Sequence, residues 1–144
     1  MLRRHDLDEL GLRLLNQTSY PSLGHMIVEE GATTLWESWF FSDNVFSHDH
    51  PMFASSEVWL LQSVAGIQPH PAAKGMSHVL IKPSPPSQLE WCEAAFSTPR
   101  GRVAVSWRRD GADLHLNVSV PPNVLATIHV PGKGGYYERG GLDL

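Results

Sequence analysis

The stretch Pro69-His70-Pro71-Ala72-Ala73-Lys74-Gly75 divides the sequence into two parts whose apolar residues follow different periods. Upstream of it, apolar residues recur at the spacing of one face of a helix. Downstream, they alternate with polar residues, as in a strand with one buried face. Proline and glycine are typical of the connection between such parts. The sequence therefore predicts an α+β fold that is helical up to about residue 70 and β from about residue 76.

The upstream part predicts helices separated by loops. We expect helices over Leu7–Gln17, Ala32–Phe41 and Met52–Val64, because apolar residues recur there at helical spacing. Pro51 suits the first turn of the last of these helices. Leu23–Ile27 is expected to be a short connector between the first two.

The downstream part predicts an antiparallel β-sandwich, because short apolar runs recur about every ten residues between turns. Asp110-Gly111 is the strongest hairpin sequence among these turns. The expected strands are Val79–Pro83, Leu89–Ser97, Arg102–Arg108, Leu114–Val120 and Leu125–Val130.

Alternation within these strands predicts which side chains are buried. Val103, Val105 and Trp107 lie on one face of their strand. We expect that face to be buried together with the apolar side chains of the next strand, Leu114, Leu116, Val118 and Val120. Trp91 is expected to pack in the core as well.

Composition and charge exclude several classes of protein. The 144 residues carry a formal net charge of −4 and are 42% hydrophobic, which favours a packed core and argues against a nucleic-acid-binding protein. No apolar run approaches the ~18 residues of a membrane helix, so no membrane partner is expected. The first residues are unlike a signal peptide, and localisation stays open. The single cysteine, Cys92, cannot form an internal disulfide and is expected to pack within a strand.

The helical part contains more aromatic residues than its few helices can bury. These residues are Trp36, Trp39, Phe40, Phe41, Phe46, Phe53 and Trp59. Such an excess is expected of a truncated piece of a larger domain, which would expose a large apolar surface. We therefore expect either a missing N-terminal barrel segment or an oligomer to cover it.

Four stretches carry a recognisable pattern. They are Gly31-Ala32-Thr33-Thr34-Leu35-Trp36-Glu37-Ser38-Trp39, Ser47-His48-Asp49-His50-Pro51-Met52-Phe53, Leu60-Leu61-Gln62-Ser63-Val64-Ala65-Gly66-Ile67 and Val79-Leu80-Ile81-Lys82-Pro83. In this order they resemble glycoside hydrolase family 78, the α-L-rhamnosidases, and the resemblance covers about residues 7 to 131. The first stretch is the most specific of the four.

The resemblance implies a fold and an activity. Residues 1–70 would be the terminal helices of an (α/α)6 catalytic barrel, and residues 76–144 would be the C-terminal β-sandwich domain. The implied reaction is hydrolysis of terminal α-L-rhamnose from glycosides with inversion. The partner would be a rhamnose-containing glycoside, either a plant glycoside or a pectic oligosaccharide. The family's general acid matches nothing in this chain, so the isolated chain is expected to be inactive.

The resemblance also implies roles for individual residues. Glu37 matches the family's general base, and we expect it at the end of a helix. His50 matches a histidine that contacts the sugar. From the residues alone, Trp36 beside Glu37 is a candidate substrate-binding residue, because an aromatic wall suits the apolar face of a sugar ring. Glu29 and Glu30, just before the motif, are expected to lie in a solvated turn or to cap the next helix.

Two alternatives remain from the residues themselves. His48, Asp49 and His50 are suitable ligand types, but a zinc site needs three or four ligands placed together, and we expect neither a metal nor a cofactor. The alternative function is a non-catalytic module, in which the β-sandwich binds carbohydrate or supports a barrel.

Overall fold

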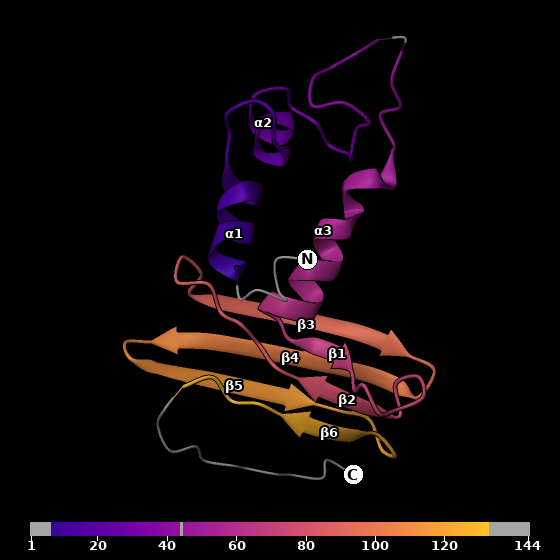
Figure 1. Cartoon of the computed structure of the whole chain (residues 1–144), viewed down its shortest axis with the longest axis vertical. Helices are drawn as coiled ribbons and strands as arrows, with labels where there is room; N and C mark the ends of the chain where they lie inside the picture. The colour runs from indigo at the N-terminus through magenta and orange to yellow at the C-terminus, as the bar shows by residue number, and fades with distance from the viewer. Residues whose placement is uncertain (1–6, 44, 133–144) are drawn as a thin grey trace.

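The computed structural model describes residues 7–43 and 45–132 of the chain, with helices gathered at one end and two β-sheets at the other (Figure 1). The helical segments are α1 (Asp8–Asn16), α2 (Leu23–Val28), η2 (Pro51–Ala54), α3 (Ser55–Trp59) and η3 (Leu60–Val64). The strands are β1 (Ile67–Pro69), β2 (His78–Ile81), β3 (Trp91–Thr98), β4 (Gly101–Asp110), β5 (Asp113–Ser119) and β6 (Leu125–Ile128). The predicted α+β class is confirmed.

The first two helices have clear local causes. Helix α1 begins with Asp8 and Glu9 and carries Arg13 in its last turn, and these charges complement the helix dipole. Helix α2 occupies the segment that we expected to be a connector. Ser22 caps it, because its hydroxyl accepts the amide hydrogen of His25 at 2.9 Å.

The helix predicted over Met52–Val64 is confirmed, although its hydrogen-bond pattern changes along its length. It begins as the 3-10 turn η2 with Pro51 in its first turn, continues as α3 and ends as the π-helical turn η3. The amide of Ala65 reaches back to the carbonyl of Leu60 at 2.9 Å, which widens this last turn.

The helix predicted over Ala32–Phe41 is absent, and that prediction was wrong. Gly31 before it has a left-handed backbone with φ of +72°, and the residues after it form bends. Their backbone groups bond to a distant segment instead of to one another. Glu37 donates to the carbonyl of Ser47 at 2.8 Å, and Leu35 accepts from the amide of His50 at 2.7 Å.

The sheets have the orders β1-β2-β6 and β3-β4-β5. Strands β3, β4 and β5 pair antiparallel, as expected from their short turns. Two features differ from the sequence prediction. Strand β1, antiparallel to β2, occupies the start of the predicted connection, and β6 pairs with β2 in parallel. This parallel pairing joins strands that are distant in sequence, so no hairpin signal reports it.

The core lies between the two sheets and confirms the predicted face of β4. Val103, Val105 and Trp107 are at most 2% exposed. The facing side chains of β5 and the residue after it are half-buried, namely Leu114, Leu116, Val118 and Val120. The prediction for Trp91 was wrong, because this side chain is 64% exposed on the opposite face of β3.

The sandwich holds the end of the helical part through backbone groups. The buried Trp107 indole donates to the carbonyl of Val64 at 2.8 Å. Just beyond it, the amide of Lys82 donates to the carbonyl of Gly66 at 3.0 Å. Gly66 has φ of +83°, and a Cβ there would overlap the backbone nitrogen of Pro83. Only glycine therefore allows the chain to leave the helix so close to β2.

Helix α1 packs against the same helix. The carboxylate of Asp8 is buried and accepts two hydrogen bonds at Oδ1, from Trp59 Nε1 at 2.7 Å and from Ser63 Oγ at 2.6 Å. Gly11 lies against the ring of Trp59, where an added Cβ would approach Cζ2 to 2.7 Å. These contacts fix α1 relative to α3 and η3.

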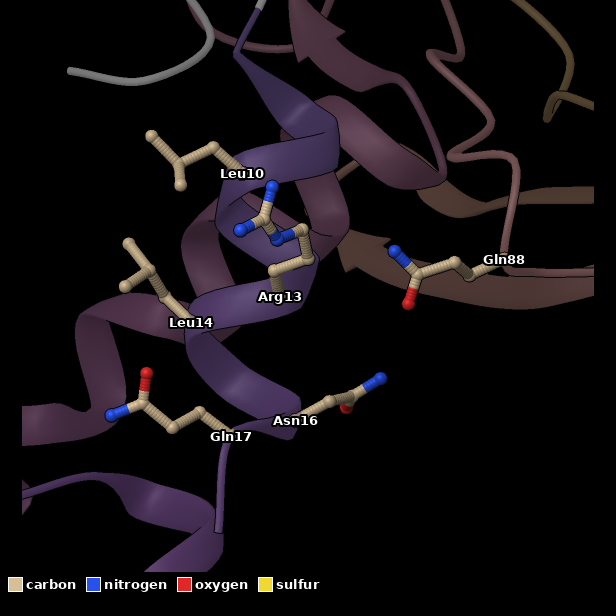
Figure 2. Close-up of a pocket in the computed structure, with 6 residues that line it drawn as sticks. All are labelled: Leu10, Arg13, Leu14, Asn16, Gln17 and Gln88. Carbon is tan, nitrogen blue, oxygen red and sulfur yellow. The ribbon is translucent and has the colours of Figure 1, made fainter. Parts of the chain in front are cut away.

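The helical part leaves many large apolar side chains on its surface. The exposed ones are Leu7, Leu10, Leu14, Tyr20, Ile27, Val28, Phe40, Phe41, Val45, Phe46, Met52, Val58 and Leu60. Figure 2 shows Leu10 and Leu14 projecting from the same side of α1. None of the helices in the described ranges is long and apolar enough to span a membrane.

We predict that Gly66→Ala destabilises the chain far more than Gly111→Ala. Both glycines have positive φ, so each alanine pays a left-handed backbone cost of about 1–2 kcal/mol. Gly111 has nothing within 4 Å of an added Cβ, whereas Gly66 would overlap backbone atoms. We expect Gly66→Ala to lower the free energy of unfolding in urea by at least about 3 kcal/mol. Equal losses for the two variants would contradict the role given to Gly66.

We further predict that the 144-residue chain self-associates in dilute buffer, because the exposed apolar side chains of its helical part have no cover within the described residues. Sedimentation velocity should show species larger than the monomer, and Leu14→Glu should reduce their fraction. The matched variant Leu125→Glu, on the exposed side of β6, should have little effect. A clean monomer would refute the prediction.

Candidate active site

The segment that carries Glu37 crosses the segment that carries His50. Glu37 and Ser47 are joined through the amide of the first and the carbonyl of the second, and the amide of His50 donates to Leu35. The hydroxyl of Thr34 adds a bond to the carbonyl of His48. These contacts bring together two motif stretches that are separate in sequence. Glu37 lies in this irregular crossing and not at the end of a helix, so that expectation was wrong.

The carboxylate of Glu37 has one fixed oxygen and one open oxygen. Oε2 accepts the amide hydrogen of Ser47 at 3.0 Å, and His50 Nδ1 lies 3.9 Å from the same atom. Within the described residues, Oε1 has no hydrogen-bond partner. The side chains of Glu37 and His50 are 39% and 38% exposed, so solvent or a ligand can reach both. The structure therefore brings two of the predicted site residues together.

Trp36, next to Glu37 in the sequence, is part of a buried aromatic wall rather than an exposed platform, since it is only 6% exposed. It packs on Met26 of α2, and its amide hydrogen lies 3.5 Å from the Met26 sulfur. Its ring centroid is 5.5 Å from that of Phe41 and 4.9 Å from that of His48. Trp36 thus fixes the loop that carries Glu37.

His48 was given no role from the sequence, and the structure places it inside this wall. Its ring is 4.9 Å from the rings of both Trp36 and Phe41. Among the described residues, nothing bonds to its buried Nε2. His48 therefore acts as a packing residue beside Glu37.

Glu30 also contacts the segment that carries Glu37, where we expected a solvated turn or a cap near the next helix. Its Oε1 is 3.4 Å from His25 Nε2, and its Oε2 accepts the amide hydrogen of Phe41 at 3.2 Å. The other ring nitrogen of His25 faces the carbonyl of Thr18 at 3.2 Å. Glu30 therefore ties α2 to the loop after Glu37. Glu29, its neighbour, is exposed as expected.

The structure does not assemble a metal site from the candidate ligands. No group of three or more histidine, cysteine, aspartate or glutamate side chains converges anywhere in residues 7–43 and 45–132. Burial raises the pKa of the Cys92 thiol, which disfavours the reactive thiolate.

A hollow of about 330 Å³ lies beside α1, and neither Glu37 nor His50 lines it (Figure 2). Its lining residues are Leu10, Arg13, Leu14, Asn16, Gln17 and Gln88.

Two protein-family profiles match the chain. The bacterial alpha-L-rhamnosidase 6 hairpin glycosidase domain matches residues 1–64, and the bacterial alpha-L-rhamnosidase C-terminal domain matches residues 66–142. Among curated proteins, the alpha-L-rhamnosidase of Streptomyces avermitilis is 32% identical over 131 residues, which are 85% of this chain and 12% of that protein. The alpha-L-rhamnosidase of Formosa agariphila is 35% identical over 138 residues, 87% of this chain and 15% of that protein.

Solved structures give the same result. The alpha-L-rhamnosidase from Dictyoglumus thermophilum matches with a TM-score of 0.81 and 34% identity, over 96% of this chain and 15% of that one. The S. avermitilis enzyme, solved in complex with L-rhamnose, matches with a TM-score of 0.82 and 27% identity. The match covers 98% of this chain and 15% of that enzyme's chain. These comparisons confirm the predicted fold class, terminal helices of a six-hairpin domain followed by a β-sandwich. The chain spans less than one sixth of the length of these relatives.

We predict that Glu30→Ala loosens the loop that follows Glu37. A hydrogen bond to a charged acceptor stabilises by about 1.5–3 kcal/mol, so the amide hydrogen of Phe41 should exchange with solvent at least about tenfold faster. Hydrogen exchange followed by NMR measures this rate. Glu29→Ala is the matched control and should leave it unchanged. Equal exchange of Phe41 in both variants would show that Glu30 does not hold the loop.

Proposed function

Because the chain belongs to the bacterial α-L-rhamnosidase family, we propose that it ends the catalytic domain of an inverting α-L-rhamnosidase and supplies its C-terminal domain. Residues 1–70 contribute the terminal helices of the barrel, and residues 76–144 form the sandwich domain, of which residues 133–144 lie outside the described structure. The substrate is a glycoside with a terminal α-L-rhamnose, from a plant glycoside or a pectic oligosaccharide.

Glu37 acts as the general base in this proposal. An inverting glycosidase needs a carboxylate that removes a proton from the attacking water, about 6.5–9.5 Å from the acid that protonates the leaving oxygen. The observation that carries the proposal is the state of the Glu37 carboxylate, with Oε2 held by Ser47 and Oε1 open. A fixed carboxylate with one open oxygen can orient a water and accept its proton.

The proposed reaction needs one group from outside this chain, a general acid that protonates the leaving oxygen. The water oxygen bonds to the anomeric carbon as the bond to the leaving oxygen breaks, and the water proton moves to Oε1 of Glu37. The leaving oxygen takes its proton from an acid on a part of the enzyme that precedes these helices. His50, whose Nδ1 lies 3.9 Å from Glu37, contacts a sugar hydroxyl, and Trp36 supports the wall behind them.

The alternative function is a non-catalytic module in which the sandwich binds carbohydrate or supports a barrel. The exposed Trp91 on the sandwich favours it. The two functions differ in one measurable respect. Catalysis depends on the Glu37 carboxylate, whereas carbohydrate binding by the sandwich does not.

We predict that the isolated chain does not hydrolyse an aryl α-L-rhamnoside, and that fusing it to the upstream part of the D. thermophilum enzyme gives a protein that does. In the fusion, Glu37→Gln should lower kcat by about 10²–10⁴-fold, because the amide keeps the shape and loses the basicity. NMR of the first-formed sugar should show the inverted anomer.

Exposed Glu57 on α3 provides the matched control, and Glu57→Gln should leave kcat within about twofold. A fusion that keeps full activity after Glu37→Gln would refute Glu37 as the base. Turnover by the isolated chain would refute the assignment of the acid to another part of the enzyme.

A further inference from the structure

The outward face of the β3-β4-β5 sheet carries an exposed indole. Successive side chains of a strand point to opposite faces, so Trp91 and Glu93 lie on the side away from Val103, Val105 and the core. Trp91 is 64% exposed, whereas Trp107 on the buried face is 2% exposed. The exposed ring forms a flat apolar surface on a rigid strand.

Strand register surrounds this indole with polar side chains. Trp91 pairs with Arg108, which pairs in turn with His115, and these three form one row across the sheet. In the next row on the same face, Glu93 pairs with Ser106, which pairs with Asn117. A shallow hollow of about 390 Å³ lies over the two rows. Its lining residues are Trp91, Cys92, Glu93, Ser106, Trp107, Arg108 and Asn117.

The polar groups of this hollow have free hydrogen-bonding capacity. Within the described residues, neither the guanidinium of Arg108 nor the carboxylate of Glu93 has a hydrogen bond or an ion pair. Asn117 makes one long contact, 3.5 Å from its Nδ2 to Ser106 Oγ. Donors, an acceptor and an amide with both functions thus surround one aromatic face.

We propose that this face binds an uncharged pyranose unit of a glycan, with the sugar stacked on Trp91. A sugar ring presents C–H bonds on its faces and hydroxyl groups at its edge. The Trp91 indole can stack on the C–H bonds, and the side chains of Arg108, Glu93 and Asn117 can form hydrogen bonds with the hydroxyl groups. The proposal takes only the class of ligand, a sugar, from the proposed function.

Charge separates a neutral sugar from other occupants. The lining of the hollow has one cationic side chain, Arg108, and one anionic side chain, Glu93. The next row of the same face adds Asp110 and Asp113, so a phosphate-bearing ligand would meet repulsion from carboxylates. A stable protein interface would need an apolar centre much larger than one indole. A neutral ligand with several hydroxyl groups is the one that uses every group present.

The test is an NMR titration of the full chain with methyl α-L-rhamnopyranoside. The indole N–H signals of Trp91 and Trp36 are assigned with Trp91→Phe and Trp36→Phe, so each site has its own reporter. The Trp91 signal should shift and saturate at millimolar sugar, as expected for a shallow site and a small ligand. Trp91→Ala should weaken binding at least about tenfold. Glu93→Gln should weaken it by a smaller factor, because the amide keeps one acceptor.

Phe96→Ala provides the control, because Phe96 is an aromatic residue on the other face of the same strand, 41% exposed, and its loss should not affect affinity. The Trp91 titration should also persist after Glu37→Gln, which separates this proposal from the proposed catalytic site. An unmoved Trp91 signal would overturn the proposal, as would binding that survives Trp91→Ala in a variant with unchanged melting temperature. Binding of a uronate alone, with no response to the neutral sugar, would overturn the choice of ligand.

Discussion

The hydrogen bond from the Trp107 indole to the carbonyl of Val64 is the contact on which the rest of the structure depends. At the π-helical end of the last helix, carbonyl groups lack partners within the helix, and the sandwich provides a partner from its own core. Gly66 then turns the chain directly into β1, where no side chain would fit. The two parts therefore share a packed junction rather than a linker. Displacement of η3 would also disturb Asp8, whose carboxylate joins α1 to this helix.

From this junction, the position of Glu37 follows through side chains and backbone rather than through a helix. Helix α2 supplies Met26, which packs against Trp36, and Glu30, two residues after the end of α2, holds the amide of Phe41. The crossing of the Glu37 and Ser47 segments then fixes one oxygen of the carboxylate. This amide hydrogen bond directs the carboxylate without a second charged group, and the other oxygen stays open for the water of the proposed mechanism.

Local patterns predict the parts of this chain whose hydrogen bonds are local. Helix α1, the helix from Pro51 to Val64 and the β3-β4-β5 meander all follow from apolar periodicity and short turns. The segment Ala32–Phe41 has the apolar content of a helix, but its backbone bonds are made to residues 47–50, and periodicity contains no information about such pairings. The same reason explains the parallel pair of β2 and β6. For the site, the motif brings Glu37 and His50 to attention, whereas Glu30 has no sequence signal apart from its charge.

Trp91 and Trp107 show what the alternation of side chains along a strand can predict about burial. Both lie in well-formed strands, and alternation states only that neighbouring side chains point to opposite faces. Which face is buried is decided by what covers the sheet. Trp107 faces β1 and the helix end, where a carbonyl needs a donor, whereas Trp91 lies in register with Arg108 on the face opposite this core. An exposed indole has a hydration cost that a buried one avoids, and nothing in the packing of the sandwich requires Trp91 there. A sugar stacked on the ring, as proposed above, would remove that cost.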